Sequence, residues 1–274
     1  MLYSMIDILL SGAQGRIGTR IIDELPQNPD IRLVGALGNP AHVTSGDTVA
    51  HNITLQSTME AYGTVSAILI EFSTPQAVMD HLLVAEDTGR PLLIGTTGFT
   101  EEQERRIETA SERIPILISH NYGIGMNAFW EILKVATEYL KDDFDVEVVE
   151  FHAGSKVDVP SGTGNTIASI IARERGDSPD EVIRYGRNKE HAFHRKPREI
   201  GVHSLRGGSY RSDHTVIFAG NGERLEFTHR EEDSSIIARG VLWGVRFLAT
   251  KEAGLYGMHD VLDFKRRSSR SDRS

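Results

Sequence analysis

Residues 5–18 read MIDILLSGAQGRIG, an apolar run that leads into three glycines with the spacing G-x-x-G-x-x-G. The apolar run is nearly continuous, which is typical of a parallel strand that is covered on both faces. Beyond the glycines, Ile17, Ile21 and Leu25 recur at the spacing of one helix face. Pro26 then predicts the end of that helix. The stretch therefore predicts a strand, a tight turn and an amphipathic helix at the start of the fold.

The three glycines each have a physical reason to be in this turn. Gly12 permits a tight bend, and Gly15 lets backbone N–H groups approach a pyrophosphate. Gly18 lets the helix pack closely against the strand. The helix N-terminus supplies positive potential for phosphates, and Arg16 can add a charge there. The turn therefore predicts dinucleotide binding; a tight β-α turn without a ligand is the alternative.

The same alternation of apolar runs and helical signals continues to about residue 120. Further strands are expected at 31–36, 67–72, 92–94 and 114–118. Pro75 suits the first turn of one intervening helix, and Thr100 with Gln103 forms a capping-box pattern before the next. Strands that alternate with helices in this way predict an α/β fold with a doubly wound parallel sheet.

The pattern changes from residue 127 onward. Helices are expected over 127–140, 161–174 and 234–250, and strands over 145–151, 202–206, 214–218 and 224–229. Strand candidates in series, separated by Gly207-Gly208 and Asn221-Gly222, indicate an antiparallel or mixed sheet. We therefore expect a dinucleotide-binding domain made of residues 1–126 and 239–274, and a second domain over residues 127–238.

The composition excludes several classes of protein. The chain has 274 residues, 30 Lys and Arg against 39 Asp and Glu, a formal net charge of −9, and no cysteine. The negative charge argues against nucleic acid or an anionic membrane as a partner. The lack of cysteine excludes disulfides, a Cys-ligated zinc site and a thiolate nucleophile, and it fits a reducing compartment.

Neither a targeting signal nor a membrane anchor is expected from the sequence. No apolar run approaches the roughly 20 residues of a membrane helix, and the first residues lack the basic start of a signal peptide. A cytoplasmic location is therefore expected. Residues 265–274, KRRSSRSDRS, are expected to form a frayed tail, with a phosphate-binding arm as the alternative.

The end of the second expected strand bears on the choice of dinucleotide. Residues 35–40 read GALGNP and contain neither the acidic residue that holds the ribose 2′-OH of NAD nor an arginine for the 2′-phosphate of NADP. The missing carboxylate removes one repulsion against NADP. The residues leave NADH and NADPH both open.

A second motif follows the strand expected at 145–151. Residues 150–163 read EFHAGSKVDVPSGT. His152 titrates near neutrality and can exchange protons, and Lys156 can donate a proton or attract a carboxylate. The Ser161 and Thr163 hydroxyls, with backbone N–H groups at a helix start, can hold a carboxylate. A sharp surface loop with an ordinary helix cap is the alternative.

The remaining histidines and the tryptophans have simpler interpretations. His191 and His194 lie in a charged stretch without a carboxylate cluster at ligand spacing, so we expect a solvated loop and no metal site. Three histidines on expected strands are interpreted as structural or interfacial: His203, His214 and His229. Trp130 and Trp243 fall on apolar helix faces and are expected in the core.

Taken together, these stretches resemble the 4-hydroxy-tetrahydrodipicolinate reductase (dihydrodipicolinate reductase) family of the diaminopimelate and lysine pathway. The K-x-D-x-P-S-G-T run and GTTGF are specific to that family, whereas the N-terminal glycine motif is not. The matching stretches span nearly the whole chain: GAQGRIG at 12–18, EFSTP at 71–75, IGTTGFT at 94–100, NYGIGMN at 121–127, EFHAGSKVDVPSGT at 150–163, LRGG and DHTVIF across 205–218, GERLEFTH at 222–229 and KEAGLYGMHDVLDF at 251–264.

The resemblance implies a fold and an activity. It implies a Rossmann-like parallel-sheet domain and an α+β substrate-binding domain with a mixed sheet that builds a homotetramer. It also implies NADH or NADPH as hydride donor to a cyclic dicarboxylate, in the reduction of 4-hydroxy-tetrahydrodipicolinate to tetrahydrodipicolinate.

The resemblance also implies roles for individual residues. The catalytic histidine falls on His152 and the proton-donating lysine on Lys156. Contacts to the substrate carboxylate fall on Ser161, Gly162 and Thr163. Cofactor contacts fall on Gly12, Ala13, Gln14, Gly15, Arg16, Ile17, Gly95, Thr96, Thr97, Ser119, His120, Asn121 and Tyr122.

The chain departs from the family pattern at four places, one of which is the pair Gly154 and Ser155, where the family often has polar or basic residues. A second histidine usually follows the catalytic one, and here that position is Ala153. The family often has a substrate-contacting arginine late in the chain, and neither Arg239 nor Arg246 aligns cleanly with it. The acidic residue after the second strand is also missing. These departures leave two alternatives: a paralogous reductase of a different cyclic imine or dicarboxylate, and a catalytically silent nucleotide-binding protein.

Overall fold

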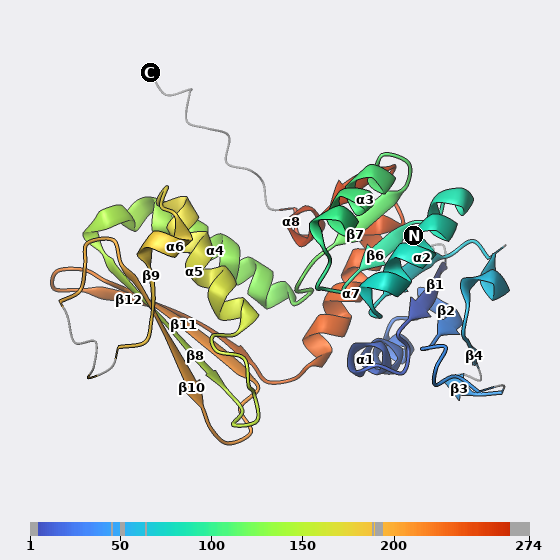
Figure 1. Cartoon of the computed structure of the whole chain (residues 1–274), viewed down its shortest axis with the longest axis horizontal. Helices are drawn as coiled ribbons and strands as arrows, with labels where there is room; N and C mark the ends of the chain where they lie inside the picture. Colours follow the sequence, from blue (N-terminus) through green and yellow to red (C-terminus); the bar gives the residue numbers. More distant parts are fainter. Residues whose placement is uncertain are drawn as a thin grey trace. The chain divides into compact units, whose positions relative to one another are not determined.

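The computed structural model describes residues 5–44, 46–49, 53–63, 65–187, 189 and 194–263. The chain divides into two compact units, Met1–Ile124 with Ser234–Ser274 and Gly125–Asp233 (Figure 1). The boundaries expected from the sequence were at 126/127 and 238/239, whereas α7 (Ser235–Leu248) falls wholly within the first unit. The basic tail and His191 lie outside the described residues.

The first unit is built on an eight-stranded sheet with the order β13-β7-β6-β5-β1-β2-β4-β3. Neighbouring strands are parallel, except that β3 and β4 are antiparallel. The strands are β1 (Ile6–Ser11), β2 (Ile31–Leu37), β3 (Thr48–Val49), β4 (Ile53–Gln56), β5 (Ile68–Glu71), β6 (Leu92–Ile94), β7 (Pro115–Ile118) and β13 (Gly254–Tyr256). This mostly parallel sheet confirms the predicted α/β class.

Apolar side chains cover both faces of this sheet. In β1, Ile8 and Leu10 belong to a core cluster shared with α1 (Arg16–Glu24) and α7, whereas Leu9 belongs to a second cluster. That second cluster is shared with α2 (Pro75–Thr88) and α3 (Glu101–Ser111). Because successive strand residues point to opposite faces, a strand with two buried faces needs apolar residues at every position. This explains the unbroken run that opens the chain.

The residues predicted to end one helix and to begin another are found at those helix ends in the structure. Pro26 lies in a 3-10 turn (η1, Leu25–Gln27) directly after α1 ends at Glu24. Thr100 and Gln103 form the reciprocal capping box of α3, with Gln103 N donating to Thr100 Oγ1 at 3.2 Å and Thr100 N to Gln103 Oε1 at 2.9 Å. A second 3-10 turn, η3 (Met59–Tyr62), and the short helix α8 (Met258–Val261) complete this unit.

The second unit contains a five-stranded mixed sheet with the order β12-β11-β8-β10-β9. The central strand β8 is parallel to β10 and antiparallel to β11, which confirms the predicted mixed sheet. The strands are β8 (Asp145–His152), β9 (Ile183–Tyr185), β10 (Ile200–Arg206), β11 (Ser212–Ala219) and β12 (Arg224–Glu231). The helices are α4 (Ile124–Leu140), η4 (Lys141–Asp143), α5 (Gly162–Glu174) and α6 (Pro179–Val182).

Helices α4 and α5 cover one face of this second sheet (Figure 1). Val146 and Val148 of β8 pack against Leu133 of α4 and Ile167 of α5. Glu150 and His152 continue the same face of β8, because they lie two and four residues beyond Val148. The covered face of the sheet therefore leads from a hydrophobic core to two polar side chains at the end of β8.

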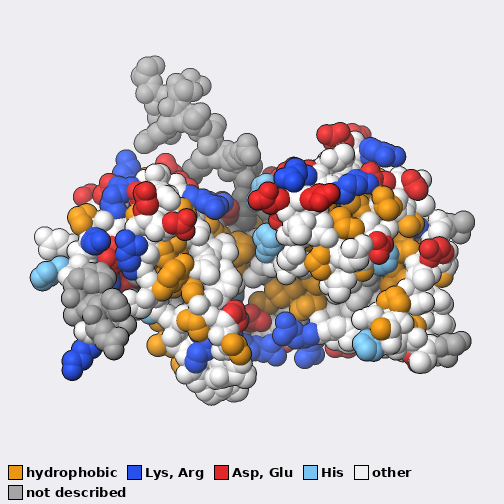
Figure 2. Space-filling view, in the orientation of Figure 1, with side chains coloured by type: hydrophobic (Ala, Val, Ile, Leu, Met, Phe, Trp, Pro, Cys, Tyr) orange, Lys and Arg blue, Asp and Glu red, His pale blue; other side chains and the backbone are white. Residues whose placement is uncertain are grey.

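The surface carries charges of both signs. On the view in Figure 2, Lys and Arg side chains are interspersed with Asp and Glu over most of the surface. Within the part of the chain that the structure describes, we find no helix with the length and apolar character that a membrane span requires. Trp130 packs against the core of the second unit, but Trp243 is 49% exposed, so its prediction as a core residue is wrong. Its neighbours on α7, Leu242 and Val245, occupy the core instead.

Candidate functional site

The glycine turn of the first unit is packed so closely that side chains are excluded. Gly12 has φ +77°, and a Cβ at that position would lie 2.1 Å from the Phe72 carbonyl oxygen. A Cβ on Gly18 would lie 2.3 Å from the Gly12 carbonyl oxygen. The helix α1 follows with Gly15 as its N-cap, no capping side chain and no acidic residue in its first turn. Its first N–H groups therefore remain available to an anion.

A cavity of about 690 Å³ lies beside this turn. Its lining includes Gly12, Gln14 and Gly15 from the turn, Gly38 and Asn39 after β2, and Thr74 after β5. These segments follow the carboxyl ends of three neighbouring parallel strands, which is where open α/β sheets bind ligands. The residues around the turn therefore fit a dinucleotide, with the uncapped helix start as the phosphate site.

The other segments expected to contact the cofactor follow β6 and β7 of the same sheet. Thr96 Oγ1 accepts a hydrogen bond from Ser73 N at 3.1 Å. Ser119 Oγ donates to the Asn121 carbonyl at 2.8 Å. The Tyr122 hydroxyl is fully buried and donates to the Ile94 carbonyl at 2.8 Å, and burial holds the Tyr122 pKa well above its usual value. These segments share one sheet edge with the glycine turn because their strands are parallel.

A buried carboxylate lies beside the cavity, and no sequence motif had indicated it. Glu71, at the end of β5, is fully buried and accepts hydrogen bonds from Ser73 Oγ at 2.6 Å and from His81 Nδ1 at 2.5 Å. Burial is the largest influence on the pKa of His81 and lowers it, but the hydrogen bond and charge of Glu71 outweigh burial and raise it overall. His81 also lines the cavity, so the wall of the cavity contains an imidazole whose protonated form is favoured by Glu71.

In the second unit, His152 ends β8 and is only 6% exposed. Its Nδ1 is buried and has no hydrogen-bond partner among the described residues, and its ring lies edge-on to His214 with 5.2 Å between centroids. Burial lowers the pKa of His152 to about 4, opposed by Glu150 and aided by His214, Lys156 and Arg206. The imidazole is therefore neutral at neutral pH and can accept a proton or a hydrogen bond.

Lys156 lies in the loop that follows β8. Its Nζ donates to the two carboxylate oxygens of Asp158 at 2.7 and 2.8 Å, and its backbone N donates to the Ala153 carbonyl at 3.1 Å. The hydrogen bond from Lys156 lowers the pKa of Asp158. The ammonium is thus paired but still partly exposed, with 29% of its side chain accessible.

The Ser161–Thr163 stretch begins α5 as a capped helix start with open N–H groups. Ser161 is the N-cap, and its Oγ accepts a hydrogen bond from Gly164 N at 3.0 Å. The N–H groups of Gly162 and Thr163 have no acceptor within the helix. A Cβ built on Gly162 would meet no atom of the described residues within 4 Å, so there is open space beside this residue. The arrangement suits a carboxylate ligand.

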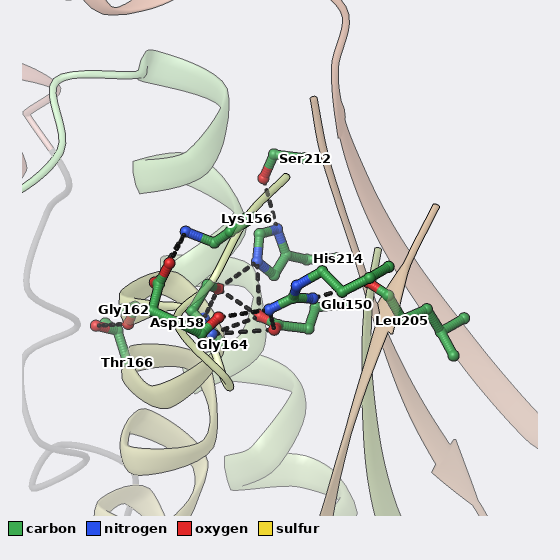
Figure 3. Close-up of polar contacts among 11 residues, drawn as sticks. Glu150, Lys156, Asp158, Gly162, Gly164, Thr166, Leu205, Ser212 and His214 are labelled. Carbon is green, nitrogen blue, oxygen red and sulfur yellow. Dashed lines mark hydrogen bonds and ion pairs between the residues drawn. The ribbon is translucent and has the colours of Figure 1, made fainter. Parts of the chain in front are cut away.

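Three further polar residues gather around this helix start, and no sequence motif had indicated them as a site: Glu150, Arg206 and His214. Glu150 is fully buried and accepts from Ser161 N at 3.0 Å, from Ser161 Oγ and from Arg206 Nη2 at 3.1 Å. His214 Nε2 lies 3.3 Å from Ser161 Oγ. Figure 3 shows Glu150 and His214 converging beside Gly164 at the start of α5. The two-residue spacing of Glu150 and His152 on a strand was the available sequence signal.

The ligand atoms of Glu150, His152 and His214 lie within 4.8 Å of one another, which is close enough to surround a metal ion. The carboxylate of Glu150 is already used by Ser161 and by the guanidinium of Arg206. A metal ion would have to displace or repel that cation. The donor set is therefore that of a hydrogen-bonded carboxylate rather than a metal ligand.

The two late arginines that did not align with the family pattern have partners in the first unit. Arg239 Nε lies 3.1 Å from Glu24 Oε1, and Arg246 Nε donates to Asp30 Oδ2 at 2.7 Å. These ion pairs tie α7 to the segment that ends α1. Among the described residues of the second unit, Arg206 is instead the arginine that contacts Glu150.

Comparison with known proteins identifies the family over nearly the whole chain. The family model for the N-terminus of dihydrodipicolinate reductase matches residues 6–122, and the model for its C-terminus matches residues 125–262. A 4-hydroxy-tetrahydrodipicolinate reductase of Methanocaldococcus jannaschii is 39% identical over 272 residues, covering 94% of this chain and 97% of the relative. A reductase of the same name from Nitrosomonas eutropha is 36% identical over 268 residues, covering 96% and 100%.

The solved structures agree on the fold. A dipicolinate-bound dihydrodipicolinate reductase from Paenisporosarcina sp. TG-14 superimposes with a TM-score of 0.77 at 24% identity, covering 93% of this chain and 99% of that one. At this identity the likeness shows the fold alone. The two family matches and the full-length relatives carry the assignment: the chain belongs to the dihydrodipicolinate reductase family.

Proposed function

We propose that the chain catalyses the NADH- or NADPH-dependent reduction of 4-hydroxy-tetrahydrodipicolinate to tetrahydrodipicolinate, a step of diaminopimelate and lysine biosynthesis. Family membership over both halves of the chain is the single observation that carries this conclusion. The alternative substrate suggested by Ala153 has no observation in its favour, because the full-length relatives carry the same reductase name.

We assign the cofactor to the cavity of the first unit. The first turn of α1 would hold the pyrophosphate, since its N–H groups have no capping side chain. Gly12 and Gly15 keep the backbone close to that site, and Gly95–Thr97 and Ser119–Tyr122 lie at the same sheet edge. The reduced nicotinamide, when bound, supplies the hydride. Residues 38–40, directly after β2, contain no acidic residue, so both NADH and NADPH remain acceptable cofactors.

We assign the substrate to the end of β8 and the start of α5. The open N–H groups of Gly162 and Thr163, with Ser161 as the cap, would bind a substrate carboxylate. Lys156, whose ammonium pairs with Asp158, would donate the proton that must follow hydride addition to the unsaturated ring left after the hydroxyl departs as water. His152, a neutral imidazole at neutral pH, would accept a proton or hydrogen bond from the substrate ring. Binding of the carboxylate orients the substrate toward both groups.

Replacement of the two proposed catalytic residues tests this function. Lys156→Ala and His152→Ala should each lower turnover of freshly prepared 4-hydroxy-tetrahydrodipicolinate by at least about 100-fold, the low end of acid–base contributions. Lys134→Ala is a matched control, because Lys134 is also paired with a carboxylate of the second unit, Glu131, but lies on α4. Oxidation of NADH or NADPH at 340 nm measures the rate. Unchanged rates in both test variants would remove these assignments.

We also propose that the chain forms a homotetramer in the cytoplasm. The face of the second sheet away from α4 and α5 carries partly accessible apolar side chains, including Leu205 at 48% exposure. Such a face suits an isologous contact between copies. The absence of cysteine fits a reducing compartment. Light scattering coupled to gel filtration would contradict the first proposal if it gave a monomer mass, and cell fractionation tests the second.

A further inference from the structure

The proposed catalytic side chains of the second unit come from separate segments that one buried carboxylate joins. His152 ends β8, Lys156 lies in the following loop, and Ser161 caps α5. Glu150 stands two residues before His152 on the same covered face of β8 and is fully buried. A buried ionised carboxylate is costly unless it is paired and hydrogen-bonded, so its partners indicate what it is there to hold.

The first partner of Glu150 is the start of α5. Its carboxylate accepts from Ser161 N at 3.0 and 3.1 Å and also from Ser161 Oγ. A Cβ on Gly164 would lie 2.5 Å from Glu150 Oε2, so the carboxylate rests directly against the first turn. Ser161 Oγ in turn accepts from Gly164 N. Glu150 thereby fixes Ser161, while the N–H groups of Gly162 and Thr163 stay open to a ligand.

The second partner of Glu150 is the loop that carries Lys156. Arg206 Nη2 donates to Glu150 Oε1 at 3.1 Å and to the Asp158 carbonyl at 2.6 Å. The carboxylate of Asp158 accepts from Lys156 Nζ. Figure 3 shows the Lys156–Asp158 pair and, beside it, the contacts that converge on Glu150. The same carboxylate is therefore connected to both the helix start and the loop.

The guanidinium of Arg206 also balances the negative charge of Glu150. A lone negative charge beside the start of α5 would repel an anionic substrate bound to the N–H groups there. Arg206 balances that charge at hydrogen-bond distance, with its side chain only 17% exposed. The pair is thus neutral toward a substrate carboxylate but still holds Ser161 and the loop by charge-assisted hydrogen bonds.

We propose that Glu150 is a positioning residue of the reductase reaction, which sets the substrate-carboxylate site through Ser161 and the Lys156 loop through Arg206. This inference rests on the proposed function. Glu150 contacts no expected reacting atom, so its effect passes through the groups that it orients. A purely structural carboxylate would affect the stability of the fold without a selective effect on substrate binding.

Glu150→Gln tests the proposal with Glu147→Gln as the matched control. Gln preserves the side-chain shape, removes the charge and turns one acceptor oxygen into a donor that opposes Ser161 N–H. Glu147 lies on the same strand and also has cationic or imidazole partners, Arg187 at 2.8 Å and His203 at 2.7 Å, but points to the other face. Thermal midpoints of both variants report how much each carboxylate contributes to stability.

The expected result is a selective loss on the substrate side. Glu150→Gln should lower kcat/KM at least about tenfold and weaken binding of the probe dipicolinate, measured by calorimetry, by a similar factor. The affinity for NADH, measured by its fluorescence, should change less than about twofold. Glu147→Gln should leave all three values near those of the wild type. Equal effects of the two variants, or unchanged dipicolinate affinity in Glu150→Gln, would overturn the proposal.

A double-mutant cycle tests the route through Ser161. If Glu150 acts by orienting Ser161, then adding Ser161→Ala to Glu150→Gln should cost less than about threefold more in kcat/KM, because the shared interaction is already lost. If the two substitutions lower kcat/KM by factors that simply multiply in the double variant, this route is contradicted. A wild type without turnover would contradict the proposed function alone, since dipicolinate binding still tests Glu150; a wild type that binds no dipicolinate would overturn both.

Discussion

The buried imidazole of His152 makes a quantitative prediction about pH and stability. Its pKa is lowered from 6.5 to about 4, with burial as the largest cause. Between these two values the unfolded chain binds a proton that the folded chain does not. The free energy of unfolding should therefore fall as the pH falls from 6.5 toward 4. One pKa unit corresponds to about 1.4 kcal/mol, so the full loss is about 3 kcal/mol, and about 2 kcal/mol is already lost at pH 5.

The two tryptophans allow this effect to be measured in the second unit alone. Trp130 belongs to the second unit and Trp243 to the first, and the chain has 2 tryptophans in all. In a Trp243→Phe background, urea unfolding followed by fluorescence reports on the surroundings of Trp130. When that background is compared with the same chain carrying His152→Gln, the contributions of all other titrating groups to the pH dependence of stability cancel. The stability advantage of the Gln variant over His152 should grow by about 2 kcal/mol between pH 7.5 and pH 5.

Two outcomes would refute this reasoning. Parallel pH dependences of the two proteins would show that His152 binds protons equally in the folded and unfolded states. An imidazole resonance of His152 that titrates near 6.5 in the folded protein would show the same directly. Either result would also remove the neutral imidazole from the proposed mechanism.

Three further predictions follow from the first unit. Gly12→Ala should abolish NADH binding in a fluorescence titration, because the new Cβ would lie 2.1 Å from the Phe72 carbonyl oxygen; binding at wild-type affinity would contradict the packing argument. Thr100→Ala should destabilise the unit by about 1 kcal/mol through loss of a helix cap, seen as a lower thermal midpoint. His81→Gln should weaken NADPH binding about threefold to tenfold at pH 6. Glu71 raises the pKa of His81, so the affinity of the wild type for NADPH should fall as the pH rises through that pKa and His81 loses its proton. An affinity that does not change with pH would argue against a protonated His81 in the site.

The sequence predicted those parts of the fold that depend on neighbouring residues. The glycine turn, the capping box of Thr100 and the end of α1 at Pro26 each result from contacts within a few positions of the chain. The short strands β3, β4, β9 and β13 were missed, because each has at most four residues and none is a continuous apolar run. Trp243 was misjudged, because a strongly apolar helix leaves the choice of its buried face to the surfaces that pack against it.

The residue types of the candidate site could be read from the chain, but their partners could not. His152, Lys156 and Ser161 lie within one short motif, so their proximity was visible in the sequence. Glu150 acquires its role only when Arg206 and His214 arrive from β10 and β11, more than fifty residues away. Whether a buried carboxylate is ionised, and whether a nearby imidazole loses its proton, depends on desolvation and on charges assembled by the tertiary fold. Local chemistry follows from the order of the residues, whereas their electrostatic state is decided only when distant strands are packed together.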